Sequence, residues 1–102
     1  MRNIPPQLNP LLNDFIPEAV LDYHGFESLT AHEIEYELRK FIEESLANEY
    51  TNILVVTGKG QKVRPQVDKL LHRNKHVAHV KQAGYFNGQD GAFEVTLAKK
   101  LR

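Results

Sequence analysis

The sequence has no cysteine, no tryptophan and no apolar run as long as a membrane-spanning helix. Without cysteine the chain has no disulfide, no thiolate nucleophile and no sulfur-ligated metal site. The first residues, Met1 to Pro6, also lack the apolar stretch of a secretory signal peptide. We therefore expect a cytoplasmic protein that does not bind a membrane.

Net charge is absent as well, because 13 acidic residues balance 13 Lys and Arg. The balance hides an asymmetry: residues 1–51 carry ten acidic and three basic residues, whereas residues 52–102 carry three acidic and ten basic. A basic half suggests a surface that meets an anion, but the charged outer faces of helices would give the same counts. The positions of the basic residues must decide between these interpretations.

Prolines divide the chain of 102 residues into an arm and one domain. Residues 1–18 contain four prolines, which exclude a regular helix or a central strand there, so we expect an extended arm. Residues 19–102 are enough for one domain of ordinary composition but not for two. We expect this domain to be a monomer.

Apolar periodicity predicts an α/β fold. Short runs rich in branched residues indicate strands, and apolar spacings of three and four indicate helices, the first of which begins at a capping box of Thr30 and Glu33. The predicted elements are strands at 19–24, 52–57, 77–83 and 92–98 and helices at 31–47 and 65–73. This β-α-β-α-β-β order predicts a two-layer α/β sandwich with a mixed four-stranded sheet. The first three strands should be parallel and the last antiparallel, at or near an edge.

The first predicted strand ends with an acid and a histidine two residues apart, Asp22 and His24. In an extended chain these side chains share one face. A neutral imidazole can take a proton from a hydroxyl and return one to a leaving oxygen, while a carboxylate orients it. Two other roles are open: a structural hydrogen bond that closes the loop, or part of a divalent-cation site, although no further ligand stands at an obvious spacing.

The second strand ends in a glycine turn, Gly58-Lys59-Gly60. Because parallel strands bring their carboxyl ends together, this turn should lie on the same sheet edge as the acid and the histidine. The glycines let backbone N–H groups approach an anion, and Lys59 adds a positive charge. Lys62 and Arg64 follow closely, so we expect a short basic track for a phosphate backbone. An ordinary strand-to-helix turn is the simpler alternative.

The glycine-rich loop before the last strand holds two adjacent aromatic residues, Tyr85 and Phe86. They could stack on a nucleobase, or they could pack against the domain. The other histidines have no acidic neighbour arranged like Asp22, and we interpret them as surface or helix-end residues: His32, His72, His76 and His79.

The two motifs together resemble the small MutS-related (Smr) domain family. Leu21-Asp22-Tyr23-His24-Gly25 is similar to its LDxHG motif, and Thr57-Gly58-Lys59-Gly60 is similar to its TGxG or HGxG motif. The resemblance covers about residues 19–98 and implies a fold like the C-terminal domain of bacterial translation initiation factor three. With no MutS ATPase region and no pentatricopeptide array, the chain resembles a stand-alone Smr protein or an excised domain.

The resemblance implies nucleic-acid binding and, as in many members, endonuclease activity on DNA or RNA. Some members cut mRNA at stalled or collided ribosomes. Asp22 and His24 match the residues linked to cleavage, and the Gly58–Gly60 turn matches the family's glycine turn. Thr57 stands where some members have His, so any catalytic help from that His is absent here.

We therefore expect an endonuclease that acts on RNA in preference to DNA, with the adjacent 2′-hydroxyl as nucleophile. The catalytic residues would be Asp22 and His24, and the nucleic-acid-binding residues would be Gly58, Lys59, Gly60, Lys62 and Arg64. This route requires no cofactor and assigns no residue to a metal, although a divalent cation could take part. The alternatives are a non-catalytic nucleic-acid-binding or ribosome-binding module, and a DNA-nicking endonuclease in repair or recombination.

Overall fold

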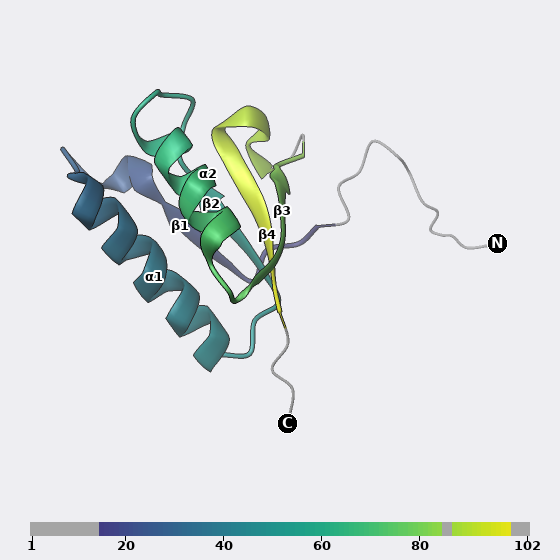
Figure 1. Ribbon diagram of the computed structural model, residues 1–102. Helices are drawn as coiled ribbons and strands as arrows, with labels where there is room; N and C mark the ends of the chain where they lie inside the picture. The colour runs from purple at the N-terminus through teal and green to yellow at the C-terminus, as the bar shows by residue number, and fades with distance from the viewer. Residues whose placement is uncertain (1–14, 85–86, 99–102) are drawn as a thin grey trace.

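The computed structural model describes residues 15–84 and 87–98. The elements in this part of the chain are β1 (Ala19–Asp22), α1 (Ala31–Ala47), β2 (Asn52–Val56), α2 (Val63–Arg73), β3 (Val77–Gln82) and β4 (Ala92–Leu97), with 3₁₀ turns at Tyr23–Gly25 and Gln89–Gly91. Both helices lie on one side of a single sheet (Figure 1), which confirms the predicted two-layer α/β sandwich. Residues 1–14 of the predicted arm, and Tyr85 and Phe86, lie outside the described residues.

The strands follow the order β1-β2-β4-β3 across the sheet. β1 pairs with β2 in parallel, whereas β4 pairs antiparallel with both of its neighbours, β2 and β3. The first three strands therefore run in one direction and the last runs against them, as predicted. However, β4 lies inside the sheet, one strand in from the edge, and the edge strand on that side is β3.

The main core lies between the sheet and the helices. Alternate residues of the inner strands, such as Ile53 and Val55 on β2 and Val95 on β4, are fully buried against the helices. Ile34 on α1 and Val67 on α2 pack into the same cluster. This alternation is the period of two that an extended chain imposes, and it places both helices on one face.

The predicted start of the first helix is confirmed. The N–H of Thr30 donates to Glu33 Oε1 at 2.8 Å, and the N–H of Glu33 donates to Thr30 Oγ1 at 3.1 Å, so the capping box is complete. The second helix begins at Val63, two residues before the predicted start, with Pro65 in its first turn. Proline is tolerated there because N–H groups of the first turn have no partner within the helix.

The opposite face of the sheet carries a smaller apolar cluster and one buried carboxylate, that of Glu94. Glu94 Oε2 accepts hydrogen bonds from the N–H of Gly84 and from Asn87 Nδ2, at 2.8 and 3.1 Å. Asn87 Nδ2 also donates to the carbonyl oxygen of Phe15 at 3.0 Å. These bonds hold the beginning and end of the loop before β4 against the sheet. No helix in residues 15–84 or 87–98 is long and apolar enough to cross a membrane.

Candidate functional site

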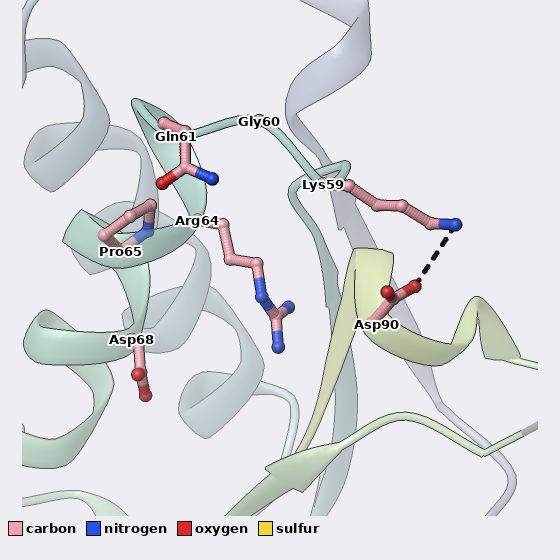
Figure 2. Close-up of a pocket in the computed structure, with 7 residues that line it drawn as sticks. All are labelled: Lys59, Gly60, Gln61, Arg64, Pro65, Asp68 and Asp90. Carbon is pink, nitrogen blue, oxygen red and sulfur yellow. Dashed lines mark ion pairs between the residues drawn. The ribbon is translucent and has the colours of Figure 1, made fainter.

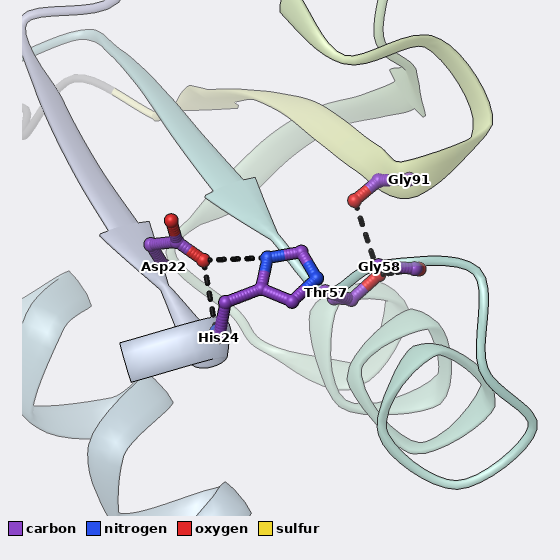
Figure 3. A network of polar contacts seen from close by, with 5 residues as sticks. All are labelled: Asp22, His24, Thr57, Gly58 and Gly91. Carbon is purple, nitrogen blue, oxygen red and sulfur yellow. Dashed lines mark hydrogen bonds and ion pairs between the residues drawn. The ribbon is translucent and has the colours of Figure 1, made fainter. Parts of the chain in front are cut away.

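The acid and the histidine contact each other, but not for the reason that the sequence suggested. β1 ends at Asp22 rather than at His24, and the chain turns into a 3₁₀ turn over Tyr23–Gly25. Asp22 Oδ1 accepts the N–H of His24 at 2.9 Å and lies 3.0 Å from His24 Nδ1 (Figure 3). The predicted shared face of an extended strand is therefore wrong, and the capping bond of the turn brings the two side chains together instead.

This contact favours one tautomer of the neutral imidazole. An ionised carboxylate only accepts hydrogen bonds, so His24 Nδ1 must carry the proton that faces Asp22. In the neutral imidazole Nε2 is then left with its lone pair. Both side chains are more than half exposed, at 65% for His24 and 54% for Asp22. The pair therefore offers a base that solvent and a large substrate can reach.

Tyr23, between the two polar residues, anchors the turn to the core. Its side chain is buried, and its hydroxyl donates to the carbonyl oxygen of Ile34 on α1 at 2.8 Å. Burial, with a smaller contribution from the Glu37 carboxylate, raises the pKa of the Tyr23 hydroxyl above its ordinary value. Tyr23 thus faces away from the site, and the turn that carries His24 is tied to the first helix.

The glycine turn meets the histidine at Gly58. Gly58 has a positive φ of 77°, and a Cβ added to it would lie 2.8 Å from His24 Nε2. Only glycine satisfies both the backbone conformation and the close approach of the ring. The predicted juxtaposition of the two motifs on one sheet edge is therefore present, with the imidazole lying on the backbone of the turn (Figure 3).

A third strand supports this turn. The N–H groups of Thr57 and Gly58 both donate to the carbonyl oxygen of Gly91 at 2.9 Å, just before β4 begins. The buried Thr57 hydroxyl donates to the carbonyl oxygen of Gly58 at 2.7 Å. The Gly58 N–H is consequently committed within the protein and does not face an anion. The backbone N–H groups of Lys59 and Gly60 have no acceptor in the part of the chain that the structure describes.

The basic residues after the turn take different positions. Lys59 Nζ lies 3.4 Å from Asp90 Oδ1, across an exposed ion pair (Figure 2). Lys62 is exposed at the start of α2, where its carbonyl oxygen accepts a hydrogen bond from Gln66 Nε2. Arg64 is partly buried, with its guanidinium carbon 4.3 Å from the centre of the Phe93 ring. The basic residues therefore do not form a single track. Lys62 lies on the surface, whereas Lys59, Gly60 and Arg64 help to line a cavity.

A second Asp–His pair shows what is particular about the first. Asp68 Oδ1 and His72 Nδ1 also lie 3.0 Å apart, but they stand one turn apart on the exposed face of α2. A salt bridge of this kind on a helix surface is an ordinary stabilising contact. The pair at Asp22 and His24 differs because its ring rests on the Gly58 turn.

Sequence reasoning missed Asp90 and Gly91. Both belong to the loop before β4, which the sequence marked only as a glycine-rich linker. They reach the site because β4 pairs with β2, with Val56 opposite Ala92 in the register. An expectation of the correct strand order would have identified them. Among the residues that the structure describes, no three His, Asp or Glu side chains are grouped as metal ligands would be.

Known proteins are similar to this chain in sequence and in fold. The family model described as the Smr domain matches residues 21–98. Two proteins named Endonuclease MutS2, from Streptococcus agalactiae and Streptococcus pyogenes, are each 39% identical over 82 residues, which is 79% of this chain and 10% of each relative. The chain therefore spans about a tenth of the length of these curated relatives.

Two solved structures have the same fold. The Smr domain of Thermus thermophilus MutS2 has a TM-score of 0.67 and 26% identity, over 81% of this chain and 99% of that one. YdaL, a stand-alone small MutS-related protein from Escherichia coli, has a TM-score of 0.70 and 28% identity, over 81% of this chain and 67% of that one. The family match covers most of the chain and both motifs that form the site, and the chain belongs to the Smr domain family.

Proposed function

We propose that this domain is an endonuclease that cleaves RNA by acid–base chemistry at His24. The observation that carries the proposal is the contact of Asp22 Oδ1 with His24 Nδ1. The same His24 ring lies against the backbone of Gly58. It orients the imidazole and leaves Nε2 as a base at a glycine turn where a phosphate backbone has room to approach. The similarity to proteins named Endonuclease MutS2 supports a nuclease at this site.

The proposed reaction needs an internal nucleophile. His24 Nε2 takes the proton of a ribose 2′-hydroxyl, and the 2′-oxygen forms a bond to the adjacent phosphorus. The bond from phosphorus to the 5′-oxygen breaks, and the imidazolium returns the proton to that leaving oxygen. The products are a 2′,3′-cyclic phosphate and a 5′-hydroxyl, so one histidine and one orienting carboxylate are sufficient.

RNA is the proposed substrate because DNA lacks this hydroxyl. The side chains of Lys59, Lys62 and Arg64 would hold the phosphate backbone, together with the N–H groups of Lys59 and Gly60. Within a cytoplasmic setting the RNA could be mRNA on a ribosome, as the family resemblance suggests. The chemistry itself can be tested on free RNA.

The test compares wild type with Asp22→Ala and His24→Ala on a labelled single-stranded RNA. We expect His24→Ala to lose at least about a hundredfold in cleavage rate, because general acid–base catalysis contributes on the order of 10²–10⁴-fold. Asp22→Ala should lose less, since it removes the orienting group and not the base. His79→Ala, which removes an exposed histidine on the edge strand β3, is the matched control and should cleave normally.

Two further measurements separate the mechanisms. A single 2′-deoxy substitution at the cleaved position should block cleavage there, and a chelator should leave the rate unchanged. Unaltered cleavage by both Asp22→Ala and His24→Ala would end the catalytic assignment. Loss of activity with the chelator would point to a divalent cation, and cleavage of duplex DNA would favour the DNA-nicking alternative.

A binding module without catalysis is the second candidate. The exposure of both Asp22 and His24 favours it, because enzymes gain from a site that excludes water. In this case wild type would bind RNA or ribosomes and cleave neither, and His24→Ala would alter binding only.

A further inference from the structure

A cavity lies on the far side of the glycine turn from β1. Its volume is about 310 Å³, and it opens between the turn, the first turns of α2 and the loop before β4 (Figure 2). The residues that line it are Lys59, Gly60, Gln61, Arg64, Pro65, Asp68 and Asp90. This volume is at the lower end of the range for sites that bind small organic molecules, and it exceeds what one phosphate group would fill.

Among the residues that the structure describes, Arg64 is the charged group lining this cavity that has no counterion. The two carboxylates have side-chain partners of their own, since Asp90 contacts the Lys59 ammonium and Asp68 contacts the His72 imidazole. Arg64 instead lies over the ring of Phe93, and its Nη1 is inaccessible to solvent and has no hydrogen-bond partner among the residues described. A buried donor left in this way is costly unless a ligand satisfies it.

Arg64 is also held in place before any ligand arrives. Phe93 is 4% exposed and belongs to the main core, so the guanidinium lies over a fixed ring. Stacking on an aromatic face and a planar fork of donors suit arginine to phosphate groups and nucleobases. Lysine at this position would keep the charge and lose the fork.

The cavity adjoins the turn that the His24 ring contacts. Gly58 touches the His24 ring, and the next two residues, Lys59 and Gly60, line the cavity. Two residues of extended chain span about 7 Å at most, comparable with the length of one nucleotide unit. A strand with its phosphate at His24 can therefore place the neighbouring nucleotide in the cavity.

We propose that this cavity binds one unstacked nucleotide next to the phosphodiester at His24, and that the domain therefore acts on single-stranded nucleic acid. The inference rests on the proposed function and names its substrate class. Arg64 binds the phosphate of that nucleotide. The Pro65 ring offers an apolar surface to the base, and Gln61, Asp68 and Asp90 offer hydrogen-bonding groups to its edge. A base inside a duplex is stacked and paired, so it cannot enter without being extruded.

Binding to a short fluorescent 2′-O-methyl RNA tests this inference, because that strand cannot be cleaved through a 2′-hydroxyl. The probes are the single strand, the same strand in a duplex, and a single strand of abasic residues with the same phosphates. We expect the intact single strand to bind about tenfold more tightly than either other probe, a difference of about 1.4 kcal/mol, because the duplex keeps its bases stacked and the abasic strand has none.

Arg64→Ala locates the effect at the cavity. It should weaken binding of the intact strand about tenfold and binding of the abasic strand much less, because without a base in the cavity the neighbouring phosphate is not held at Arg64. Arg64→Lys, which preserves the charge but loses the planar guanidinium over Phe93, should bind the intact strand with an affinity between those of wild type and Arg64→Ala. Arg73→Ala removes the same charge from the far end of α2 and should weaken both strands slightly and equally. Circular dichroism of each variant confirms that it is folded.

The outcomes distinguish the two proposals. If wild type binds the duplex and the abasic strand as tightly as the intact single strand, the cavity does not hold a base and this inference fails, while cleavage at His24 can stand. If Arg64→Ala weakens all three probes equally, Arg64 is a general phosphate contact and the inference fails as well. If wild type neither binds nor cleaves any nucleic acid, the proposed function falls and the cavity assignment falls with it.

Discussion

Gly58 combines two constraints that are independent of each other. Its φ of 77° lies in the left-handed region, and the space where a Cβ would stand is occupied by the His24 ring. A backbone constraint alone would affect stability, and a steric constraint alone would affect the position of the ring. Because one residue meets both, the glycine turn is part of the proposed catalytic geometry and not only a connection to α2.

Gly58→Ala should therefore reduce both stability and cleavage. The left-handed backbone costs an alanine about 1 kcal/mol, and the new methyl group must displace the imidazole from its contact with Asp22. We expect RNA cleavage to fall by about tenfold or more, measured under conditions where the variant is fully folded.

Gly60→Ala is the matched control for that substitution. A Cβ added at Gly60 meets nothing within 4 Å, and its φ is outside the left-handed region. We expect normal stability and a smaller loss of cleavage than in Gly58→Ala, because this substitution keeps the N–H of residue 60 and leaves the His24 ring in place. Equal effects of the two substitutions would mean that turn flexibility, and not the contact with His24, is what cleavage requires.

The residues of the site were predictable where they stand within a motif. Asp22, His24 and Gly58 were identified because an acid, a histidine and a glycine turn at strand ends carry recognisable chemistry. Asp90 and Gly91 were not, because their position depends on β4 pairing with β2. Local sequence patterns do not specify which strands are neighbours, since that is decided by packing over the whole sheet.

At the scale of elements, the helices and strands followed from periodicity, and their ends depended on particular side chains. α1 begins and ends as predicted, because the capping box at Thr30 and Glu33 is a local signal. β1 is shorter than predicted, because the Asp22 carboxylate caps the turn at His24 N–H and ends the strand. Alternation of side chains predicts a strand. It does not show where a polar side chain bonds to the backbone and ends the hydrogen-bonded pairing of the strand in a turn.

The capping box predicts a stability that depends on pH. The backbone N–H of Thr30, then its hydroxyl, lowers the pKa of Glu33 below its ordinary value of 4.5. A carboxyl group with a lowered native pKa contributes stability above its ordinary pKa, and this contribution is lost as the pH falls through the native value. Glu33→Gln should therefore be less stable than wild type at pH 7, and the difference should shrink below pH 4.5.

Urea denaturation of both proteins at neutral and acidic pH measures that difference. Glu43→Gln is the control, because Glu43 lies on the exposed face of α1 and its side chain makes no hydrogen bond or ion pair with another described residue. Its difference from wild type should be small at both pH values. A stability loss in Glu33→Gln that is as large in acid as at neutral pH would show that the cap acts through shape and not through charge.

At the scale of the whole molecule, a net charge of zero allows binding to an anion because the charges are separated. Many of the acidic residues lie on α1, whereas the basic residues near the proposed site lie in the glycine turn and at the start of α2. Nucleic acid would thus be attracted by a local group of cations and not by the overall field. Such binding should weaken with salt according to the few phosphates that it neutralises.

The salt dependence of RNA binding can identify these cations. For a single strand, each phosphate contact contributes about 0.7 to the slope of log affinity against log salt concentration. Lys62→Ala should lower the slope by about this amount, whereas Lys59→Ala should lower it less, because Asp90 already neutralises part of that charge. Lys75→Ala, an equal change of charge beyond the end of α2, should leave the slope unchanged. If both Lys59→Ala and Lys62→Ala also leave it unchanged, the phosphate backbone does not cross the glycine turn, since these two side chains would there displace counterions from the phosphates that they neutralise.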